Sequence, residues 1–205
     1  ELGFSFDVVS TGMILSAEQA ALVSDFCEQS AKKGALVFVD PIMGDEGKLY
    51  NGVGEETIAH MRKMVAVADC IVPNYTEAAY LADMPYHEDM TEEEARALTI
   101  RLHEMGAKSV VVTSTKVDGE NCVVGYDGTE GEFFRIPFDL IPVRFVGTGD
   151  IFAAVMLGRL VDGVPLQEST HRAMDAVRTM IDRNRDKEDK YLGIPIETCL
   201  EVLDE

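Results

Sequence analysis

Basic residues are scarce in this sequence, and their scarcity excludes one large class of partner. Only 18 Lys and Arg stand against 37 Asp and Glu, which gives a formal net charge of −19. Such a chain is poorly suited to the phosphate backbone of DNA or RNA, so we expect no nucleic-acid partner. A nucleotide is still allowed, because a small anion needs only local N–H groups, a few cations and a metal ion.

Cysteine pairs and long apolar runs are also missing. The four cysteines lie far apart and form no C-x-x-C pair, so the sequence predicts reduced thiols rather than a zinc or redox site. No apolar run reaches the length of a membrane span, and no basic segment followed by an apolar stretch opens the chain. We therefore expect a soluble, cytoplasmic protein with no membrane partner.

The length and the alternation of patterns predict the fold class. With 205 residues, 46% of them hydrophobic, the chain can bury one core, and we expect a single domain over residues 1–205. Short β-branched runs alternate with segments of helical period, which is typical of βαβ units around a mainly parallel sheet. A strand signal follows almost directly on Glu1, so we expect that an N-terminal portion is missing.

The individual elements follow from turn and capping signals. Ser16 with Gln19, and Thr91 with Glu94, have the spacing of helix capping boxes. Strands are predicted at 8–10, 35–39, 70–72 and 109–113, an antiparallel pair at 121–126 and 132–137, helices at 16–34, 55–67, from 74 and at 91–106, and a helical last third. The Gly-rich segment 44–54 is predicted to be a loop, and the mixed-charge run 183–190 a solvated helix end or loop.

A glycine-rich turn before an apolar helix is the most informative local pattern. Its residues are Gly147, Thr148, Gly149 and Asp150. The first N–H groups of a helix can hold a phosphate, and a carboxylate beside them can accept a proton from an attacking hydroxyl. This combination suggests phosphoryl transfer to an alcohol. The same four residues also fit a plain capped turn.

Other polar residues follow predicted strands, where ligands bind in open α/β sheets. Asp40 follows the second strand, Asn74 and Glu77 follow the third, and Thr113 and Ser114 end the fourth. We expect these residues and the Gly-Thr-Gly-Asp turn to lie along one edge of the sheet.

Four passages together resemble the ribokinase-like superfamily, and within it the pyridoxal (vitamin B6) kinase family. They are Asp40-Pro41-Ile42-Met43-Gly44-Asp45, Val72-Pro73-Asn74-Tyr75-Thr76-Glu77-Ala78, Val111-Val112-Thr113-Ser114 and Gly147-Thr148-Gly149-Asp150. The resemblance covers nearly the whole chain, but only the later two-thirds of such a kinase. It implies a three-layer α/β/α sandwich with a mainly parallel sheet and a few antiparallel strands, and a homodimer.

The resemblance also implies the catalytic roles. Asp150 would be the general base for the hydroxymethyl group of the substrate, and the N–H groups of Gly147, Thr148 and Gly149 would form the anion hole. Asp150 could instead only stabilise the helix dipole.

Nucleotide and metal roles are implied for a second group. Asn74 and Glu77 occupy the N-x-x-E position that organises Mg²⁺ near the triphosphate, although the same spacing describes a helix capping box. Asp40 and Asp45 would lie beside the phosphates and cations, although Asp45 also fits a solvated turn. Thr113 and Ser114 resemble contacts to the nucleotide phosphates, or simply end a strand.

The substrate is less closely defined than the reaction. Thr11 and Met13 follow the first strand as substrate candidates, and Met13 stands where pyridoxal kinases often have an aromatic residue. A thioether can still cover an aromatic ring. Thr-Gly-Met is also similar to hydroxymethylpyrimidine kinases, but their anion-hole motif typically ends in Gly-Cys.

The leading hypothesis is therefore an ATP- and Mg²⁺-dependent kinase for the 5′-hydroxymethyl group of pyridoxal, pyridoxine or pyridoxamine. A monovalent cation is compatible with this family. One alternative is a kinase of hydroxymethylpyrimidine or another small alcohol. An alternative of another class is a non-catalytic protein that binds a nucleotide or a vitamer.

Overall fold

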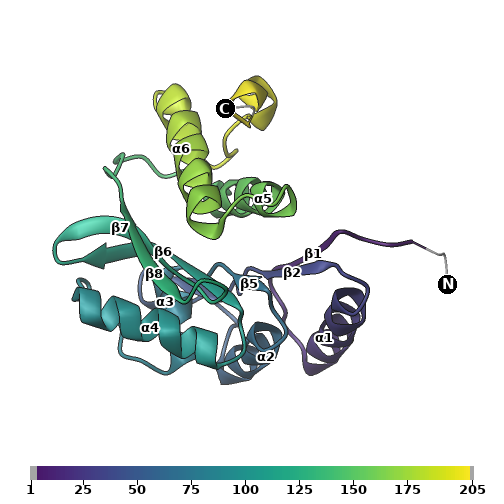
Figure 1. Ribbon diagram of the computed structural model, residues 1–205. Coiled ribbons are helices and arrows are strands. Elements are labelled where there is room, and N and C mark those ends of the chain that lie inside the picture. Colours follow the sequence, from purple (N-terminus) through teal and green to yellow (C-terminus); the bar gives the residue numbers. More distant parts are fainter. Residues whose placement is uncertain (1–3, 204–205) are drawn as a thin grey trace. The chain divides into compact units, whose positions relative to one another are not determined.

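Residues 4–203 are described by the computed structural model of the chain (Figure 1). Contacts divide the chain into two compact units, with the division between Phe138 and Asp139. Both β-sheets belong to the first unit, and the described part of the second unit is helical. A single domain over residues 1–205 stays a prediction.

The main sheet of the first unit is mixed and has the strand order β1-β2-β5-β6-β7-β8. Its strands are β1 (Val8–Thr11), β2 (Leu36–Val39), β5 (Cys70–Ile71), β6 (Ser109–Val117), β7 (Glu120–Asp127) and β8 (Glu132–Pro137). The first four pair in parallel, and β7 and β8 are antiparallel additions. The predicted α/β class, with a mainly parallel sheet and a few antiparallel strands, is therefore confirmed.

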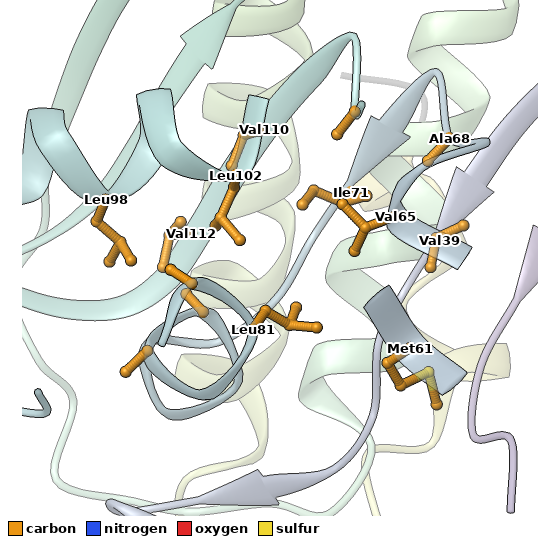
Figure 2. Packing of buried hydrophobic residues seen from close by; sticks show 14 of the residues in the cluster. Val39, Met61, Val65, Ala68, Ile71, Leu81, Leu98, Leu102, Val110 and Val112 are labelled. Atoms are coloured by element: carbon orange, nitrogen blue, oxygen red, sulfur yellow. The ribbon is translucent and has the colours of Figure 1, made fainter. Parts of the chain in front are cut away.

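Helices of the first unit cover one face of this sheet (Figure 1). They are α1 (Ala17–Ala31), α2 (Glu55–Val65), α3 (Tyr75–Ala82) and α4 (Glu92–Glu104). Alternate strand residues meet helix residues in a buried core that includes Val39, Ile71, Val110 and Val112 from the strands and Met61, Val65, Leu81, Leu98 and Leu102 from the helices (Figure 2). Because β-strand side chains alternate between faces, these β-branched runs bury every second residue against the helices.

The predicted helix caps are present, with one difference. Thr91 and Glu94 form a complete capping box, in which each side chain accepts a hydrogen bond from the other residue's backbone N–H. Ser16 accepts from the Gln19 N–H, but the Gln19 side chain accepts from Leu15 rather than from Ser16. The local sequence therefore fixes where α1 and α4 begin.

The segment predicted as a Gly-rich loop contains a small antiparallel hairpin. Its strands are β3 (Gly44–Asp45) and β4 (Lys48–Leu49), with Gly44 opposite Leu49 and Asp45 opposite Lys48. The loop prediction was wrong for these residues. Strands of two residues are too short to show a period of two in the sequence.

The second unit is built around a pair of helices, α5 (Thr148–Val161) and α6 (Leu166–Asn184). Two short 3-10 helices follow, η1 (Ile196–Thr198) and η2 (Leu200–Leu203). The buried cluster of this unit includes Phe145, Met180, Cys199 and Val202. The helical last third is confirmed, and the charged run 183–190 begins at the end of α6 and continues into a mostly exposed loop.

Helices long and apolar enough to cross a membrane do not occur among residues 4–203. The four cysteines, Cys27, Cys70, Cys122 and Cys199, are all buried and free. This agrees with the prediction of reduced thiols.

Candidate active site

Adjacent strands of the first unit end side by side and bring several of the predicted residues together. The Asp40 N–H donates to the Thr11 carbonyl, and the Thr113 N–H donates to the Pro73 carbonyl, each at 3.0 Å. Asn74 and Thr113 also form an isolated parallel β-bridge. Thr11, Asp40, Asn74 and Thr113 therefore line the carboxyl edge of the parallel strands, where ligands bind in open α/β sheets.

The end of β1 and the loop that follows it carry the two substrate candidates, Thr11 and Met13. The Thr11 hydroxyl oxygen is buried and has no hydrogen-bond partner among the described residues. Met13 is 46% exposed and is therefore accessible to a ligand. A buried polar atom without a protein partner calls for a water or a ligand, so Thr11 has an unused hydrogen-bonding group at this edge.

Asn74 and Glu77 form the capping box of α3 that their spacing predicts. Asn74 Oδ1 accepts from the Glu77 N–H at 3.0 Å, and Glu77 Oε2 accepts from the Asn74 N–H at 2.8 Å. The same two side chains reach the segment after β2. Glu77 Oε1 accepts from the Met43 N–H at 2.9 Å, and Asn74 Nδ2 donates to the Gly44 carbonyl at 2.8 Å. This pair therefore joins α3 to the hairpin that carries Asp45.

Glu77 is a buried carboxyl group with an unusual ionisation. Its residue is 3% exposed, and burial raises its pKa to about 7 against the lowering effect of its backbone N–H partners. The negative charge of Asp40 raises the pKa further. Glu77 and Asp40 therefore lie close enough to interact electrostatically, which is a feature of many functional sites.

The carboxylate oxygens at this edge of the sheet are of the type that Mg²⁺ prefers as ligands. Mg²⁺ prefers oxygen ligands and is commonly held by one or two carboxylates together with substrate phosphates. Asp40 and Asp45 are the carboxylates that could take this role. Both Glu77 oxygens accept backbone N–H groups, which suits an orienting role. No group of three or more His, Cys, Asp or Glu residues among the described positions has the arrangement of a self-sufficient metal site.

Contrary to the prediction from the sequence, Thr113 and Ser114 do not end the strand, because β6 continues to Val117; they lie at an irregularity within it. The pairing of β6 with β7 shifts register between Val112 and Thr115, and Ser114 has a left-handed backbone with φ of +56°. Bulges of this kind redirect side chains and are frequent next to active sites. Ser114 is exposed at this point, as a contact to a nucleotide phosphate requires.

The Gly-Thr-Gly-Asp turn belongs to the second unit and starts α5. Gly147 is the N-cap residue with φ of +85°, a conformation that favours glycine. Thr148, Gly149 and Asp150 form the first turn, and the first i to i−4 bond runs from the Ile151 N–H to the Gly147 carbonyl. The N–H groups that precede it have no acceptor within the helix.

The Asp150 carboxylate lies over the start of this helix. Its Oδ2 atom is 3.8 Å from the position that a Cβ on Gly147 would take, and the residue is exposed. The Thr148 hydroxyl donates to the Phe145 carbonyl at 3.4 Å. The turn therefore presents a carboxylate and a set of N–H donors together, as its sequence predicts.

Sequence reasoning missed two residues that hold the hairpin. Thr76 Oγ1 accepts from the Gly47 N–H at 2.8 Å, and the Tyr86 ring lies against Gly47. Thr76 follows the N-cap of an apolar helix, and Tyr86 is one aromatic residue in a loop. Their partner is far away in the sequence, so no local pattern could have revealed them.

Together, the mixed sheet, its strand-end carboxylates and the helix-start turn define a protein of the ribokinase-like class. Comparison with known proteins agrees, because residues 2–193 match the family described as phosphomethylpyrimidine kinase. The chain belongs to that family. Its resemblance to the pyridoxal kinases, inferred from the four motifs, is confirmed by the relatives that it matches.

Three of these relatives show how far the similarity extends. Pyridoxal kinase of Arabidopsis thaliana is 32% identical over 171 residues, which are 80% of this chain and 53% of that protein. A Bacteroides thetaiotaomicron structure with pyridoxal, provisionally described as a phosphomethylpyrimidine kinase, has 33% identity and a TM-score of 0.92. The match covers 100% of this chain and 73% of the Bacteroides chain. Pyridoxal kinase of Lactobacillus plantarum has 28% identity and a TM-score of 0.83, over 98% of this chain and 72% of its own.

The chain spans about half the length of the curated relatives it matches, 53% for the plant enzyme and 52% for pyridoxal kinase of Sus scrofa. The activity, substrates and partners of the whole protein are therefore proposals.

Proposed function

We propose that the protein transfers a phosphoryl group from ATP to the 5′-hydroxymethyl group of pyridoxal, pyridoxine or pyridoxamine. One observation carries the proposal: the start of α5 combines a left-handed Gly147 with the Asp150 carboxylate in the first helical turn. Phosphoryl transfer to an alcohol needs both a proton acceptor and a cradle for negative charge.

Asp150 is the general base in this proposal. An alcohol is a weak nucleophile at neutral pH, and a carboxylate within hydrogen-bond reach takes its proton as the bond to phosphorus forms. The N–H groups of Gly147, Thr148 and Gly149 hold the oxygens of the transferring phosphoryl group. The positive end of the α5 dipole supports the same role.

The strand ends of the first unit hold the nucleotide phosphates in this proposal. Thr113 and Ser114 donate from their hydroxyl groups, and Asp40 and Asp45 would hold Mg²⁺. Asn74 and Glu77 keep the hairpin and the helix start in place. Bound Mg²⁺ would neutralise charge on the triphosphate. The electrostatic interaction between the Asp40 and Glu77 carboxyl groups, at the carboxyl edge of the sheet, supports this assignment.

The vitamer is the substrate that the comparisons favour. Curated relatives at 32% and 34% identity are pyridoxal kinases, and a structure at 33% identity contains pyridoxal. In this chain the unpartnered Thr11 hydroxyl and the exposed Met13 side chain supply one polar and one polarizable apolar group for a pyridine ring.

The test is ATP-dependent phosphorylation of pyridoxal by the full-length protein, with Asp150→Asn as the control. We expect turnover that is lost in the variant, with ATP still bound. A folded protein that binds ATP and the vitamer but transfers no phosphoryl group between them would support the non-catalytic alternative. Failure to bind ATP would contradict the kinase proposal itself.

A pyrimidine kinase is the second candidate, because the matched family is described as phosphomethylpyrimidine kinase and Met13 replaces the aromatic residue common in pyridoxal kinases. Turnover of the three vitamers and of hydroxymethylpyrimidine should be measured side by side. Activity confined to the pyrimidine would replace the vitamer in the proposal.

We also propose that the protein acts in the cytoplasm as a homodimer. Four free, buried cysteines suit a reducing compartment, whereas the dimer rests on family analogy alone. Analytical ultracentrifugation of the full-length protein tests the dimer, and a single monomeric species would contradict it.

A further inference from the structure

The β3–β4 hairpin carries Asp45 and has a tight turn at its tip. Glu46 and Gly47 connect the two strands with φ of +52° and +77°, the pattern of a type I′ turn. The Asp45 carboxylate accepts from the Glu46 N–H at 2.9 Å, so the side chain and the turn share one local structure. A shift of the tip would therefore move the Asp45 carboxylate.

Thr76 holds this tip from the side of α3. The residue is 2% exposed, and its hydroxyl oxygen accepts the Gly47 N–H at 2.8 Å across 29 positions of sequence. Helix capping does not need this hydroxyl, because Asn74 and Glu77 complete the capping box. Thr76 thus makes a tertiary contact that the helix itself does not require.

Tyr86 supports the same tip from another direction. A Cβ placed on Gly47 would lie 3.1 Å from Cε1 of Tyr86, so the ring is in close contact with the turn. The Tyr86 ring stacks on Tyr75 with centroids 4.7 Å apart, and the Tyr75 hydroxyl accepts from the His87 N–H. Burial, followed by the charges of Asp45 and nearby glutamates, raises the pKa of Tyr86, which agrees with a ring close to the hairpin carboxylates.

We propose that Thr76 is a positioning residue for nucleotide binding: by fixing the Gly47 N–H, it sets where the Asp45 carboxylate lies. The inference rests on the proposed function, which places Asp45 beside the cation and the phosphates. Thr76 touches neither substrate in this proposal and acts only through the hairpin.

The experiment compares Thr76→Val, which keeps the shape and removes the acceptor, with Thr76→Ser, which keeps the acceptor. Thr99→Val is the matched control, since Thr99 is also a buried helical threonine and its hydroxyl donates to Arg96 within α4. Four quantities are measured on the full-length protein, with pyridoxal as the phosphoryl acceptor: amide exchange at Gly47, the Kd for Mg·ATP, the KM for Mg·ATP, and kcat.

We expect Thr76→Val to speed exchange at Gly47 about tenfold, because one buried hydrogen bond is lost. The Kd and KM for Mg·ATP should rise by about five- to tenfold, because the free energy of one hydrogen bond is lost from nucleotide binding. We expect kcat to change by less than about twofold. Thr76→Ser should restore the exchange rate at Gly47 and the Kd and KM for Mg·ATP. Thr99→Val should leave these quantities at wild-type values.

Unchanged exchange at Gly47 in Thr76→Val would overturn the inference, as would faster exchange with an unchanged Kd. Failure of Thr76→Ser to restore the Kd would do the same. If Thr76→Val does not fold, Tyr86→Leu loosens the same tip at a partly exposed ring and must raise the Kd for Mg·ATP, or the inference is wrong.

Failure of the proposed function has a different signature. A wild-type protein that binds Mg·ATP but phosphorylates no vitamer would contradict the proposed reaction, while the Kd ratio of Thr76→Val to wild type would still decide the role of Thr76. A wild-type protein that does not bind Mg·ATP would overturn both.

Discussion

The starts of α3 and α5 both carry a carboxylate in the first turn, but their surroundings differ. Glu77 is buried and accepts N–H groups from Met43 and Asn74, whereas Asp150 is exposed over the start of α5. A carboxylate already occupied by protein donors maintains structure, and one open to solvent can exchange a proton with a substrate. The same residue pattern thus holds a framework together in one unit, and in the other it leaves a carboxylate open for the proton transfer that we propose.

The largest expected effect is on turnover, from Asp150→Asn in the full-length protein. Loss of a general base typically costs a factor of about 10² to 10⁴, so kcat should fall by about a thousandfold. The melting temperature should change little, because Asp150 is exposed. Steady-state kinetics and thermal unfolding on the same sample check both parts. A variant with near wild-type kcat would show that Asp150 serves the helix dipole only.

Glu77→Ala should have the opposite signature, with a large loss of stability. It leaves the buried N–H of Met43 and the partly buried N–H of Asn74 without their acceptor. The cost is about 1–3 kcal/mol for the Met43 group and less for the Asn74 group. Urea unfolding measures the loss, and Glu77→Gln, which keeps one carbonyl acceptor, should lose less. Equal stability of Glu77→Ala and wild type would remove the contrast between the two helix starts.

The raised pKa of Glu77 predicts a pH dependence of stability. Because the pKa is about 7 in the folded chain against 4.5 for an ordinary Glu, folding favours the protonated form. The contribution is complete below about pH 4.5 and is lost as the pH rises through about 7, up to about 3 kcal/mol in all. Urea unfolding from pH 4.5 to 8 should show this slope in the wild type and a weaker one in Glu77→Gln. A difference between the two that is independent of pH would refute the shifted pKa.

The smallest expected effect concerns the irregularity in β6. Ser114 has φ of +56°, so Ser114→Gly should relieve backbone strain and change stability by no more than about 1 kcal/mol. Ser114→Val should destabilise by more, since β-branched residues avoid this conformation. Thermal unfolding of the pair checks the sign of each change. A more stable Val variant would contradict a strained turn at this position.

Local signals predicted much of the fold. The capping box of Thr91 and Glu94 located α4, and β-branched runs located the parallel strands because burial selects those residues. The β3–β4 hairpin was missed because its strands depend on Thr76, Asn74 and Glu77 from a later helix. Contacts between residues so far apart in the sequence produce no hydrophobic periodicity from which the strands could be predicted.

The candidate site was predictable to a similar depth. The positions of strand ends and helix starts predicted which polar residues lie together at one edge of the sheet. The β-bridge between Asn74 and Thr113 confirms this for those two residues. The same spacing did not reveal that Glu77 is buried, or that Thr76 bonds to Gly47, because burial depends on what packs over a helix. The roles of these residues in catalysis stay predictions.

The burial of α3 has a consequence for mutational tolerance. Every residue of this helix except Tyr80 is buried. A scan with substitutions that change side-chain size along α3 would therefore report mainly on folding, because they disturb packing first, and only shape-conserving changes such as Thr76→Val can report on binding. At the exposed start of α5 the two signals separate, so the role proposed for Asp150 can be tested while the chain still folds.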